Sequence, residues 1–385
     1  MKDGRAHAAD LRLKLAPVKM RAAVLREPRR PVEILEVELA PPRAREVLVK
    51  IAAGGVCASD LHVVDGTLPE PMPLVLGHEA AGVVVETGPG VTRVREGDHV
   101  VLAIVPSCGE CAPCRRARPT FCAVFGAAAG AGTLGDGTSR LSLDGTILYH
   151  FNSVSSFAEY AVVPESAAVA IPRDVPLEAA ALIGCAVLTG YGAVANIARV
   201  EAGASVAVWG CGGVGLSAIQ GARLAGADPI VAVDVSPEKL ELALSLGATA
   251  LVNAAEVDAV EAVRAEAGGA GVDYAFEALG REGTIQQAWS SLASGGTAVV
   301  IGTMPKGDLL TIDPWGFIQE KNLLGCFLGR PRIEADVPRL VELYRAGELK
   351  LDEVVSHRLA LGELELGLER LRAGTAARQV ILFDP

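Results

Sequence analysis

The sequence predicts an α/β protein with a strand-rich first domain and a second domain built on a doubly wound parallel sheet. Three observations support this fold class. Short apolar runs bounded by Gly and Pro fill the first half of the chain. From about Thr189 such runs alternate with Ala- and Leu-rich stretches of helical length. A glycine-rich turn, GCGGVG at 210–215, joins one of these runs to the next helical stretch.

The composition excludes several classes of protein. The chain has 385 residues, 50% of them hydrophobic and 21% charged, which suits two buried cores and not a disordered chain. The net charge of −11 argues against nucleic-acid or anionic-membrane partners, which require a basic face. No signal peptide is evident, and the apolar runs are shorter than the roughly 20 residues of a membrane span. We therefore expect a cytoplasmic protein.

The first half is predicted to be mainly strands with long loops. Residues 1–19 show no clear pattern and are expected to form a mobile extension. Strand-like runs follow at 19–25, 32–39, 46–56, 80–88, 98–105 and 157–164. The stretch from Phe125 to Asn152 is rich in Gly, Thr, Ser and Asp, and we expect it to be a surface excursion.

The second half has the pattern of strands covered by helices on both faces. Strand-like runs rich in Val, Ile and Ala occupy 205–210, 229–235, 272–280 and 297–303. Near Leu328 the alternation weakens. The chain then ends with a helix-like segment at 362–374 and a strand-like run at 378–383.

The glycine-rich turn predicts a dinucleotide site. Gly210, Gly212 and Gly215 form G-x-G-x-x-G directly after the run VAVW, and Asp234 lies 19 residues beyond the last glycine. These glycines permit a tight turn, close approach of the backbone to a pyrophosphate, and close helix–strand packing. Asp234 can bind the adenosine ribose and would repel a 2′-phosphate, which favours NAD, although Lys239 could allow some NADP. A purely structural turn is the alternative.

A cluster of four cysteines predicts a structural zinc site. Cys108, Cys111, Cys114 and Cys122 follow the spacing C-x2-C-x2-C-x7-C. Four thiolates complete a tetrahedral zinc shell, which would fold a lobe lacking its own core. An iron–sulfur cluster is the competing interpretation, but the bacterial run has three residues between its last cysteines and a Pro afterwards. Here seven intervene and Ala123 follows.

A second group of residues has the composition of an open zinc site. Two Cys and one His, here Cys57, His78 and Cys185, are the protein ligands of a catalytic zinc that keeps one position for water or substrate. The three residues are far apart in the sequence, so their spacing alone is weak evidence. Taken singly, each could equally be an ordinary core residue.

Together these motifs resemble the zinc-dependent medium-chain alcohol dehydrogenases. GHE at 77–79, the four-cysteine loop, IGC and TGYGA within 183–193, the glycine-rich turn and Arg378 occur in that family's order. The resemblance covers nearly all of the chain from about Lys19 to Phe383. It implies that Cys57, His78 and Cys185 bind a catalytic zinc and that the four-cysteine loop binds a structural one.

The resemblance also implies the domain organisation. Residues 1–186 would form a GroES-like catalytic domain with both zinc sites. Residues 187–328 would form a Rossmann NAD-binding domain, and 329–385 would return to the catalytic domain.

The implied reaction is the reversible, NAD-dependent oxidation of a primary or secondary alcohol to an aldehyde or ketone. Zinc would lower the pKa of the alcohol, and hydride would pass to the nicotinamide. The proton would leave through Ser59, the nicotinamide ribose and His62. Asp60 would orient His78. Glu79 would lie beside the metal, with a structural salt bridge, for example to Arg378, as its alternative.

Further coenzyme contacts are implied by the resemblance. Thr189 and Val214 would support the nicotinamide ring, Arg281 would lie near the adenine, and Arg378 would contact the pyrophosphate. Backbone groups of Ile301, Cys326 and Leu328 would hold the carboxamide. The complete set of expected coenzyme residues is Thr189, Gly210, Gly212, Gly213, Val214, Gly215, Asp234, Lys239, Leu279, Arg281, Ile301, Cys326, Leu328 and Arg378.

Three features bear on coenzyme affinity and on the substrate. Many animal members have a basic residue after the first zinc cysteine, whereas this chain has Ala58, which predicts weaker NAD binding. An apolar substrate channel would be lined by Leu68, Ile104 and Phe151, with Leu328. Leu68 and Gly126 stand where the glutathione-dependent formaldehyde dehydrogenases have charged anchors, which disfavours a glutathione adduct but not another thiol adduct.

Three alternative functions remain open at this stage. One is an oxidoreductase of the same fold with tightly bound NAD and another electron acceptor, or one acting chiefly as an aldehyde reductase. Another is a thiol-adduct formaldehyde dehydrogenase. The third is a noncatalytic zinc- and NAD-binding protein, which the complete set of site residues disfavours. The long stretch between Cys122 and Phe157 is typical of dimeric members, so we expect a homodimer joined at the edges of the coenzyme-domain sheets.

Overall fold

The computed structural model describes residues 17–384, which form two compact units. The first unit runs to Gly184 and takes in Arg358–Glu369 and the end of the chain from Gln379. The second comprises Cys185–His357 and Arg370–Arg378.

These units differ from the expected division at several bounds. Cys185 and Ala186, which we expected in the first domain, belong to the second unit, as do residues 329–357 and 370–378, which we expected to return to the first domain. Of the predicted extension 1–19, residues 1–16 lie outside the described part, whereas Val18 and Lys19 already belong to the first strand.

A closed barrel forms one sheet of the first unit. Its strands, in the order β1-β2-β7-β8-β4, are β1 (Val18–Leu25), β2 (Glu33–Leu39), β7 (Leu141–Leu143), β8 (Thr146–His150) and β4 (Leu74–Val75). Strands β7 and β8 come from the stretch 125–152, so the expectation of a surface excursion was wrong. The stretch contributes the buried side chains of Leu134, Leu141 and Leu148 to the barrel core.

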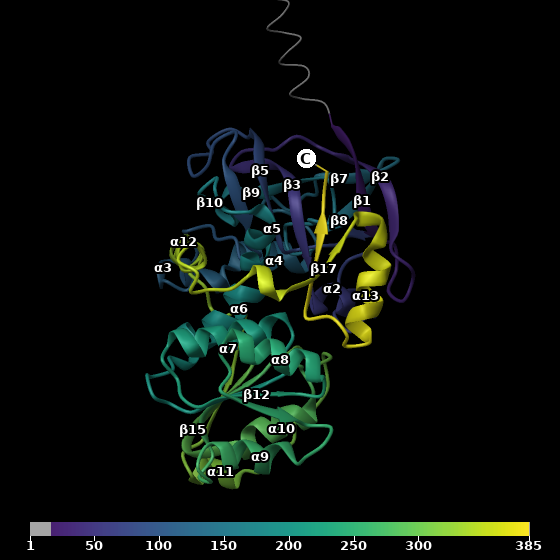
Figure 1. The fold of residues 1–385 in the computed structure, drawn as a ribbon. Coiled ribbons are helices and arrows are strands. Elements are labelled where there is room, and N and C mark those ends of the chain that lie inside the picture. The colour runs from purple at the N-terminus through teal and green to yellow at the C-terminus, as the bar shows by residue number, and fades with distance from the viewer. Residues whose placement is uncertain (1–16, 385) are drawn as a thin grey trace, which may run out of the picture. The chain divides into compact units, whose positions relative to one another are not determined.

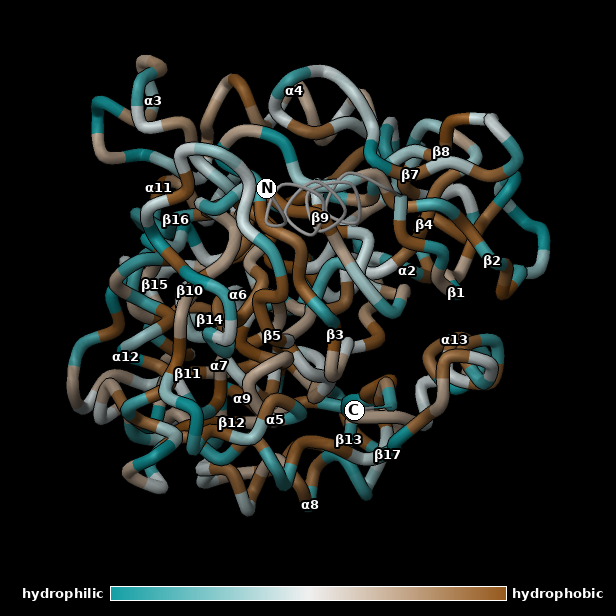
Figure 2. Tube along the Cα trace, turned by 90° about the horizontal axis from the view of Figure 1, so that it is seen from above, coloured by the Kyte–Doolittle hydropathy of each residue, from teal (hydrophilic) through white to brown (hydrophobic). Residues whose placement is uncertain are grey.

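A seven-stranded sheet forms the rest of the first unit's β-structure. Its main path is β10 (Ala168–Ile171), β6 (His99–Leu102), β5 (Ala80–Thr87), β3 (Glu46–Val56), β18 (Arg378–Leu382) and β17 (Val355–Leu359), while β9 (Tyr160–Pro164) also pairs with β3. Strands β3 and β5 are coloured mostly as hydrophobic in Figure 2. Buried Val and Ile residues of both strands join one core cluster.

Short helices connect these strands. They are α2 (Ala58–Val64), α3 (Ala112–Arg115), α4 (Ala123–Gly130), α5 (Leu177–Ala181) and α13 (Leu364–Arg372). Helix α13 agrees with the helix-like segment predicted near the C-terminus.

The second unit contains the predicted parallel sheet. Its strands, in spatial order, are β13 (Ala250–Asn253), β12 (Ile230–Asp234), β11 (Val206–Trp209), β14 (Val272–Glu277), β15 (Leu292–Val300) and β16 (Asn322–Gly325). In chain order this is 3-2-1-4-5-6, the arrangement of a dinucleotide-binding sheet. Strand order therefore reverses between β11 and β14, where ligands of such sheets bind.

Helices cover both faces of this sheet (Figure 1). On one face lie α7 (Gly213–Leu224) and α8 (Pro237–Leu246); on the other lie α9 (Ala259–Glu266) and α10 (Glu282–Ser291). The remaining α-helices of the unit are α6 (Ala186–Gly192), α11 (Trp315–Ile318) and α12 (Ile333–Arg345).

Within residues 17–384, no single helix combines the length and hydropathy of a membrane span, and only the bent pair 177–184 and 186–198 does so when taken together.

Candidate metal centres and coenzyme turn

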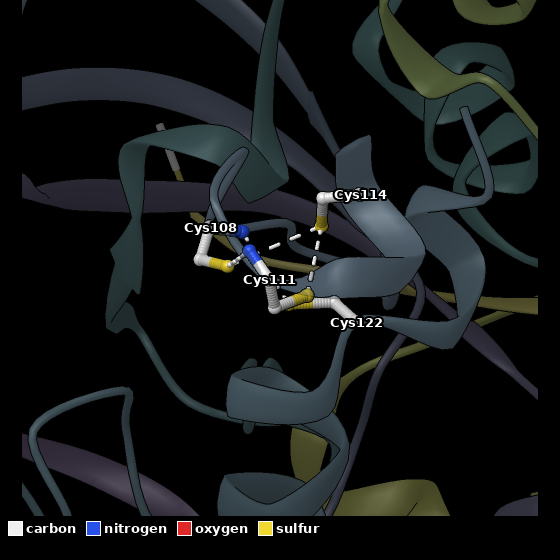
Figure 3. A group of neighbouring side chains, drawn as sticks. All are labelled: Cys108, Cys111, Cys114 and Cys122. Atoms are coloured by element: carbon white, nitrogen blue, oxygen red, sulfur yellow. Dashed lines mark hydrogen bonds between the residues drawn. The ribbon is translucent and has the colours of Figure 1, made fainter. Parts of the chain in front are cut away.

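The four cysteines of the predicted structural site converge (Figure 3). The Sγ atom of Cys111 lies 3.4 Å from that of Cys114 and 3.8 Å from that of Cys122, and the Cys108–Cys114 separation is 4.0 Å. Zinc–sulfur bonds of about 2.3 Å place tetrahedral sulfurs about 3.8 Å apart. These separations fit such a shell, and all four residues are free thiols.

Local backbone structure places these sulfurs. Cys111 caps the start of α3 and Cys122 caps the start of α4, so two helix N-termini face the cluster. The N–H groups of Cys108 and Cys111 donate to the sulfurs of Cys122 and Cys108, at 3.4 and 3.3 Å. Such donors stabilise thiolates, the form that binds metal.

The pKa values of two cysteines in this loop also favour a cation bound among the four sulfurs. Backbone N–H groups of Cys114 and Ala123 lower the pKa of Cys111 to about 6. Partial burial and the neighbouring sulfur of Cys111 raise the pKa of Cys114 to about 12. Cys111 thus loses its proton easily, and its negative charge then opposes the ionisation of Cys114. A bound dication would stabilise both thiolates and so remove this repulsion. The donor set therefore fits zinc.

The three dispersed residues of the predicted catalytic site also come together. One ligand atom from each of Cys57, His78 and Cys185 lies within 4.8 Å of the others, and all three residues are buried. Cys57 follows β3 and precedes α2, His78 precedes β5, and Cys185 precedes α6. Three residues that are far apart in the sequence therefore lie close together in the structure. Their two sulfurs and one imidazole are the donor set of an open zinc site.

Asp60 fixes the imidazole of His78. Its fully buried carboxylate accepts hydrogen bonds from the backbone N–H of Cys57 (3.0 Å) and Gly77 (3.1 Å), and Oδ1 lies 3.2 Å from Nδ1 of His78. Nε2 of His78 is buried and has no hydrogen-bond partner among the described residues. Asp60 thus holds the ring in the tautomer that leaves Nε2 for a metal.

The charge state of His78 reflects the same neighbours. Burial alone would lower the pKa of His78, but the carboxylate of Asp60 and the thiolate of Cys57 outweigh it and raise the pKa to about 10. The same negative charges would attract a metal ion in place of the proton on Nε2.

Phe151 packs against the same imidazole. The rings of His78 and Phe151 are 5.0 Å apart between centroids and meet edge to face at 80°. Phe151 is fully buried, so this expected channel residue lies directly against a ligand side chain. Leu68 and Ile104, the other expected channel residues, are half-buried, and Ile104 packs against the core of the seven-stranded sheet.

The expected proton-transfer residues lie on one helix. Ser59 and His62 are three residues apart on α2, and the Oγ of Ser59 lies 3.8 Å from the Sγ of Cys57. Positions three apart share a helix face, and both side chains are half-buried.

The expected metal neighbour Glu79 is fully buried and packs against Gly55, where a Cβ atom would lie 2.7 Å from the Glu79 carboxyl.

The glycine-rich turn lies at the carboxyl end of β11, beside the reversal in strand order. Gly210 has a φ of +93°, which favours glycine, and a Cβ on Gly215 would lie 1.8 Å from the carbonyl oxygen of Gly210. Gly212 caps α7, and apart from its neighbours in the chain no atom of the described residues lies within 4 Å of where its Cβ would be. The space beside the helix N-terminus is thus open to an anion.

Two charged residues of the second unit face this turn. Asp234 ends β12 and accepts hydrogen bonds from the backbone N–H groups of Cys211 (2.7 Å), Val235 (2.8 Å) and Ser236 (3.0 Å). The side chain of buried Arg378 packs against Gly213, with Cδ 2.9 Å from where a Cβ would lie. A carboxylate suited to binding a ribose and a guanidinium suited to binding a pyrophosphate thus both lie at the turn.

The remaining expected coenzyme residues lie on the second unit's loops and helices. Leu279 packs against Gly210, and the N–H of Ile301 donates to the carbonyl of Glu277. Thr189 is buried in α6, and Leu328 has a φ of +54°. Val214 lies on α7, Lys239 on α8, Arg281 before α10 and Cys326 after β16. Glu277, which pairs with Trp209 directly before the glycine-rich turn, belongs to no motif that the sequence predicted.

Two family models match the chain. Residues 43–173 match the alcohol dehydrogenase GroES-like domain and residues 213–346 the zinc-binding dehydrogenase domain. An alcohol dehydrogenase zinc-binding domain protein from Burkholderia ambifaria is 38% identical, with a TM-score of 0.91 over 96% of this chain and 100% of that one. The chain belongs to the zinc-binding alcohol dehydrogenases of the medium-chain dehydrogenase/reductase family.

Other members of the family resemble this dehydrogenase closely. A benzyl alcohol dehydrogenase from Acinetobacter calcoaceticus is 34% identical, with a TM-score of 0.90 over 95% of this chain and 100% of that one. A zinc-binding dehydrogenase from Sinorhizobium meliloti, solved with NADP, is 29% identical, with a TM-score of 0.79 over the same shares. The protein is therefore an oxidoreductase with a GroES-like domain and a Rossmann-like coenzyme domain.

Proposed function

We propose that this dehydrogenase catalyses the reversible oxidation of a primary or secondary alcohol by NAD, giving an aldehyde or ketone and NADH. The observation that carries the proposal is the buried set of Cys57, His78 and Cys185, a group of three candidate metal ligands to which residues 17–384 add no fourth. A dehydrogenase that activates its substrate on a metal needs this open position.

The residues around the set have distinct tasks in this proposal. Zinc bound there supplies Lewis-acid chemistry that lowers the pKa of a hydroxyl group. Asp60 keeps His78 oriented, as its 3.2 Å contact indicates. The Oγ of Ser59 accepts the hydroxyl proton, and the imidazole of His62, on the same face of α2, carries it onward. A bound nicotinamide would supply the acceptor for the substrate's hydrogen, which would leave its carbon together with both electrons of the C–H bond as a hydride.

For the coenzyme we propose NAD. The carboxylate of Asp234 at the end of β12 is oriented by three backbone N–H groups and suits the two ribose hydroxyls. A 2′-phosphate would bring negative charge to that carboxylate. The relative solved with NADP makes the comparison of both coenzymes the necessary test.

For the substrate we propose an apolar alcohol, with benzylic alcohols as the first class to examine. The relative that is a benzyl alcohol dehydrogenase shares 34% of its residues with this chain. Phe151, which contacts His78, and the half-buried Leu68 and Ile104 are apolar, as an aromatic ring requires.

The decisive experiment follows NADH absorbance at 340 nm with benzyl alcohol and a series of aliphatic primary and secondary alcohols, each with NAD and with NADP. We expect turnover with NAD, with at least a tenfold preference over NADP, and two zinc ions per chain by elemental analysis. A Cys57→Ala variant should keep its fold and one zinc ion but lose turnover. Equal turnover by this variant would refute the proposal.

The same preparation distinguishes the alternatives. NAD that remains bound through gel filtration, together with no turnover of free NAD, would favour an enzyme with another electron acceptor. Turnover that requires a thiol and formaldehyde would favour a thiol-adduct dehydrogenase. Coenzyme binding without turnover of any alcohol or aldehyde would favour a noncatalytic protein.

We also propose that the dehydrogenase is a cytoplasmic homodimer joined at the β16 edge of the coenzyme-domain sheet. Strand β16 ends the order of the sheet, and exposed apolar side chains gather in the adjoining segment 309–327. An unpaired strand edge beside apolar side chains suits pairing with a second copy.

A further inference from the structure

Glu277 is a buried carboxylate at the centre of the expected coenzyme loops. It ends β14 and is 1% exposed. In the parallel pairing of β14 with β11 it lies beside Trp209, the residue directly before the glycine-rich turn. A buried carboxylate is costly unless hydrogen bonds compensate it, so its partners indicate why it is there.

The side chain of Glu277 holds the loop that follows β14. Its Oε1 atom accepts hydrogen bonds from the backbone N–H of Leu279 (3.0 Å) and Gly280 (2.8 Å), and from the hydroxyl of Thr284 (2.7 Å). Thr284 lies in the first turn of α10. One oxygen atom therefore fixes both the loop 278–281 and the start of the helix after it.

The backbone of Glu277 holds a second loop. Its carbonyl oxygen accepts hydrogen bonds from the N–H of Ile301 (2.8 Å) and from the N–H of Gly302 (3.0 Å). These residues follow β15, the neighbouring strand. Glu277 is thus bonded to both loops that contain expected coenzyme residues at this edge of the sheet.

The two loops are packed together without spare room. A Cβ on Gly302 would lie 1.9 Å from the backbone nitrogen of Gly280, and a Cβ on Gly210 would lie 2.7 Å from Cγ of Leu279. The loop 278–281 therefore contacts both the loop after β15 and the first glycine of the fingerprint. Close-packed segments transmit a displacement to their neighbours.

We infer that Glu277 is a positioning residue for the coenzyme, because it fixes the loops 278–281 and 301–302 relative to each other and to Gly210. The inference rests on the proposed binding of NAD. The family resemblance assigns the first loop to the adenine and the second to the nicotinamide carboxamide. Glu277 would then set the spacing between the sites for the two halves of one ligand.

The test compares two carboxylate-to-amide substitutions on the same strand. Glu277→Gln leaves one oxygen acceptor but removes the charge, which weakens hydrogen bonds by about half. Asp273→Asn makes the same change at the amino end of β14, where Asp273 accepts bonds from the N–H and hydroxyl of Ser205. We expect the NADH dissociation constant, measured by fluorescence titration, to rise about fivefold to tenfold in Glu277→Gln and less than twofold in Asp273→Asn.

Thr284 gives a second test that leaves the carboxylate in place. Thr284→Val removes only the hydroxyl donor and should raise the dissociation constant about threefold, whereas Thr284→Ser keeps the donor and should bind NADH like the parent chain. Thermal unfolding of all four variants separates loss of stability from loss of positioning. If Thr284 served only to fill space, Thr284→Ser would not bind NADH like the parent chain.

The outcomes are distinct from those that test the proposed function. If the parent chain binds NADH and Glu277→Gln binds it equally well, or if Asp273→Asn weakens binding as much, the inference fails and the proposed function stands. If the parent chain binds no nicotinamide coenzyme, both fail.

Discussion

Asp60 shows how a single residue prepares the buried zinc site. One of its oxygens lies against His78, and the carboxylate also binds the backbone N–H of Cys57, so both neighbouring ligands depend on it. We predict that Asp60→Asn lowers zinc affinity about 10- to 100-fold, because the imidazole loses its charged partner. Competition with a chromogenic chelator measures this. Asp65→Asn, at the C-cap of the same helix, is the control and should release zinc like the parent chain.

Ala58 stands at the position where the family resemblance predicts a basic residue in many animal members. It is exposed at the start of α2. A basic residue there would add a charge-assisted contact to the pyrophosphate, worth about 1.5–3 kcal/mol. Ala58→Arg should therefore lower the NADH dissociation constant about tenfold or more in a fluorescence titration. Ala58→Gln controls for side-chain length, and equal tightening by both variants would show that charge is not the cause.

Short motifs in the sequence predicted those parts of the candidate sites whose residues are close together in the chain. The four-cysteine spacing and the glycine fingerprint specify their own geometry because their members are neighbours in the chain. Glu277 and the contact of Phe151 with His78 could not be predicted in this way. Each depends on segments that only the folded sheet and barrel bring together.

The four-cysteine loop is an element whose stability should depend on metal. Among the residues of α4 only Ala128 is buried, so the loop has little apolar core of its own. We expect Cys122→Ser to lose one of two zinc ions and to lower the thermal midpoint by several degrees, while the zinc held by Cys57, His78 and Cys185 remains. Elemental analysis and calorimetry measure both effects. Retention of both ions would contradict the assignment.

The barrel contains a histidine that should make its stability depend on pH. Burial, assisted by the charge of Arg140, lowers the pKa of His150 to about 3, and its Nε2 accepts the backbone N–H of Arg140 (3.2 Å). Because the unfolded chain binds a proton near pH 6.5 and the folded chain does not, stability falls as pH drops from about 6.5 toward 3.

The matched experiment isolates this histidine from the carboxylates that titrate in the same range. Glutamine at position 150 can still accept the hydrogen bond but does not titrate. Urea unfolding at pH 7 and pH 5 should therefore show a smaller loss of stability in His150→Gln than in the parent chain. An identical loss in both would show that His150 is not the cause.

Periodicity predicted four of the six parallel strands, β11, β12, β14 and β15, but not the two outer strands β13 and β16. It failed for 125–152, where the polar composition concealed β7 and β8 and the buried guanidinium of Arg140. That side chain is held by the carboxylates of Glu46 (2.9 Å) and Asp136 (2.8 Å). It also missed α12, where Pro338 interrupts the helical pattern although the helix accommodates it.

The outer strands of the parallel sheet are the basis for the oligomeric state that we expect. Both outer strands, β13 and β16, have a free edge, but the large exposed apolar side chains gather near β16. Trp315 is 62% exposed and Ile318 70% exposed, both on α11. Side chains of this size rarely cluster on a surface that stays in water.

We therefore predict that a charge at this edge separates the proposed dimer. The parent chain should have the mass of two chains in light scattering after size-exclusion chromatography at micromolar concentration, and Ile318→Glu the mass of one. Leu244→Glu places the same charge on an apolar residue of α8 that is 51% exposed and should leave the dimer intact. A monomeric parent chain would refute the dimer, and a dimeric Ile318→Glu would place its interface elsewhere. Burying a carboxylate in an apolar interface without a partner is costly enough to decide between these outcomes.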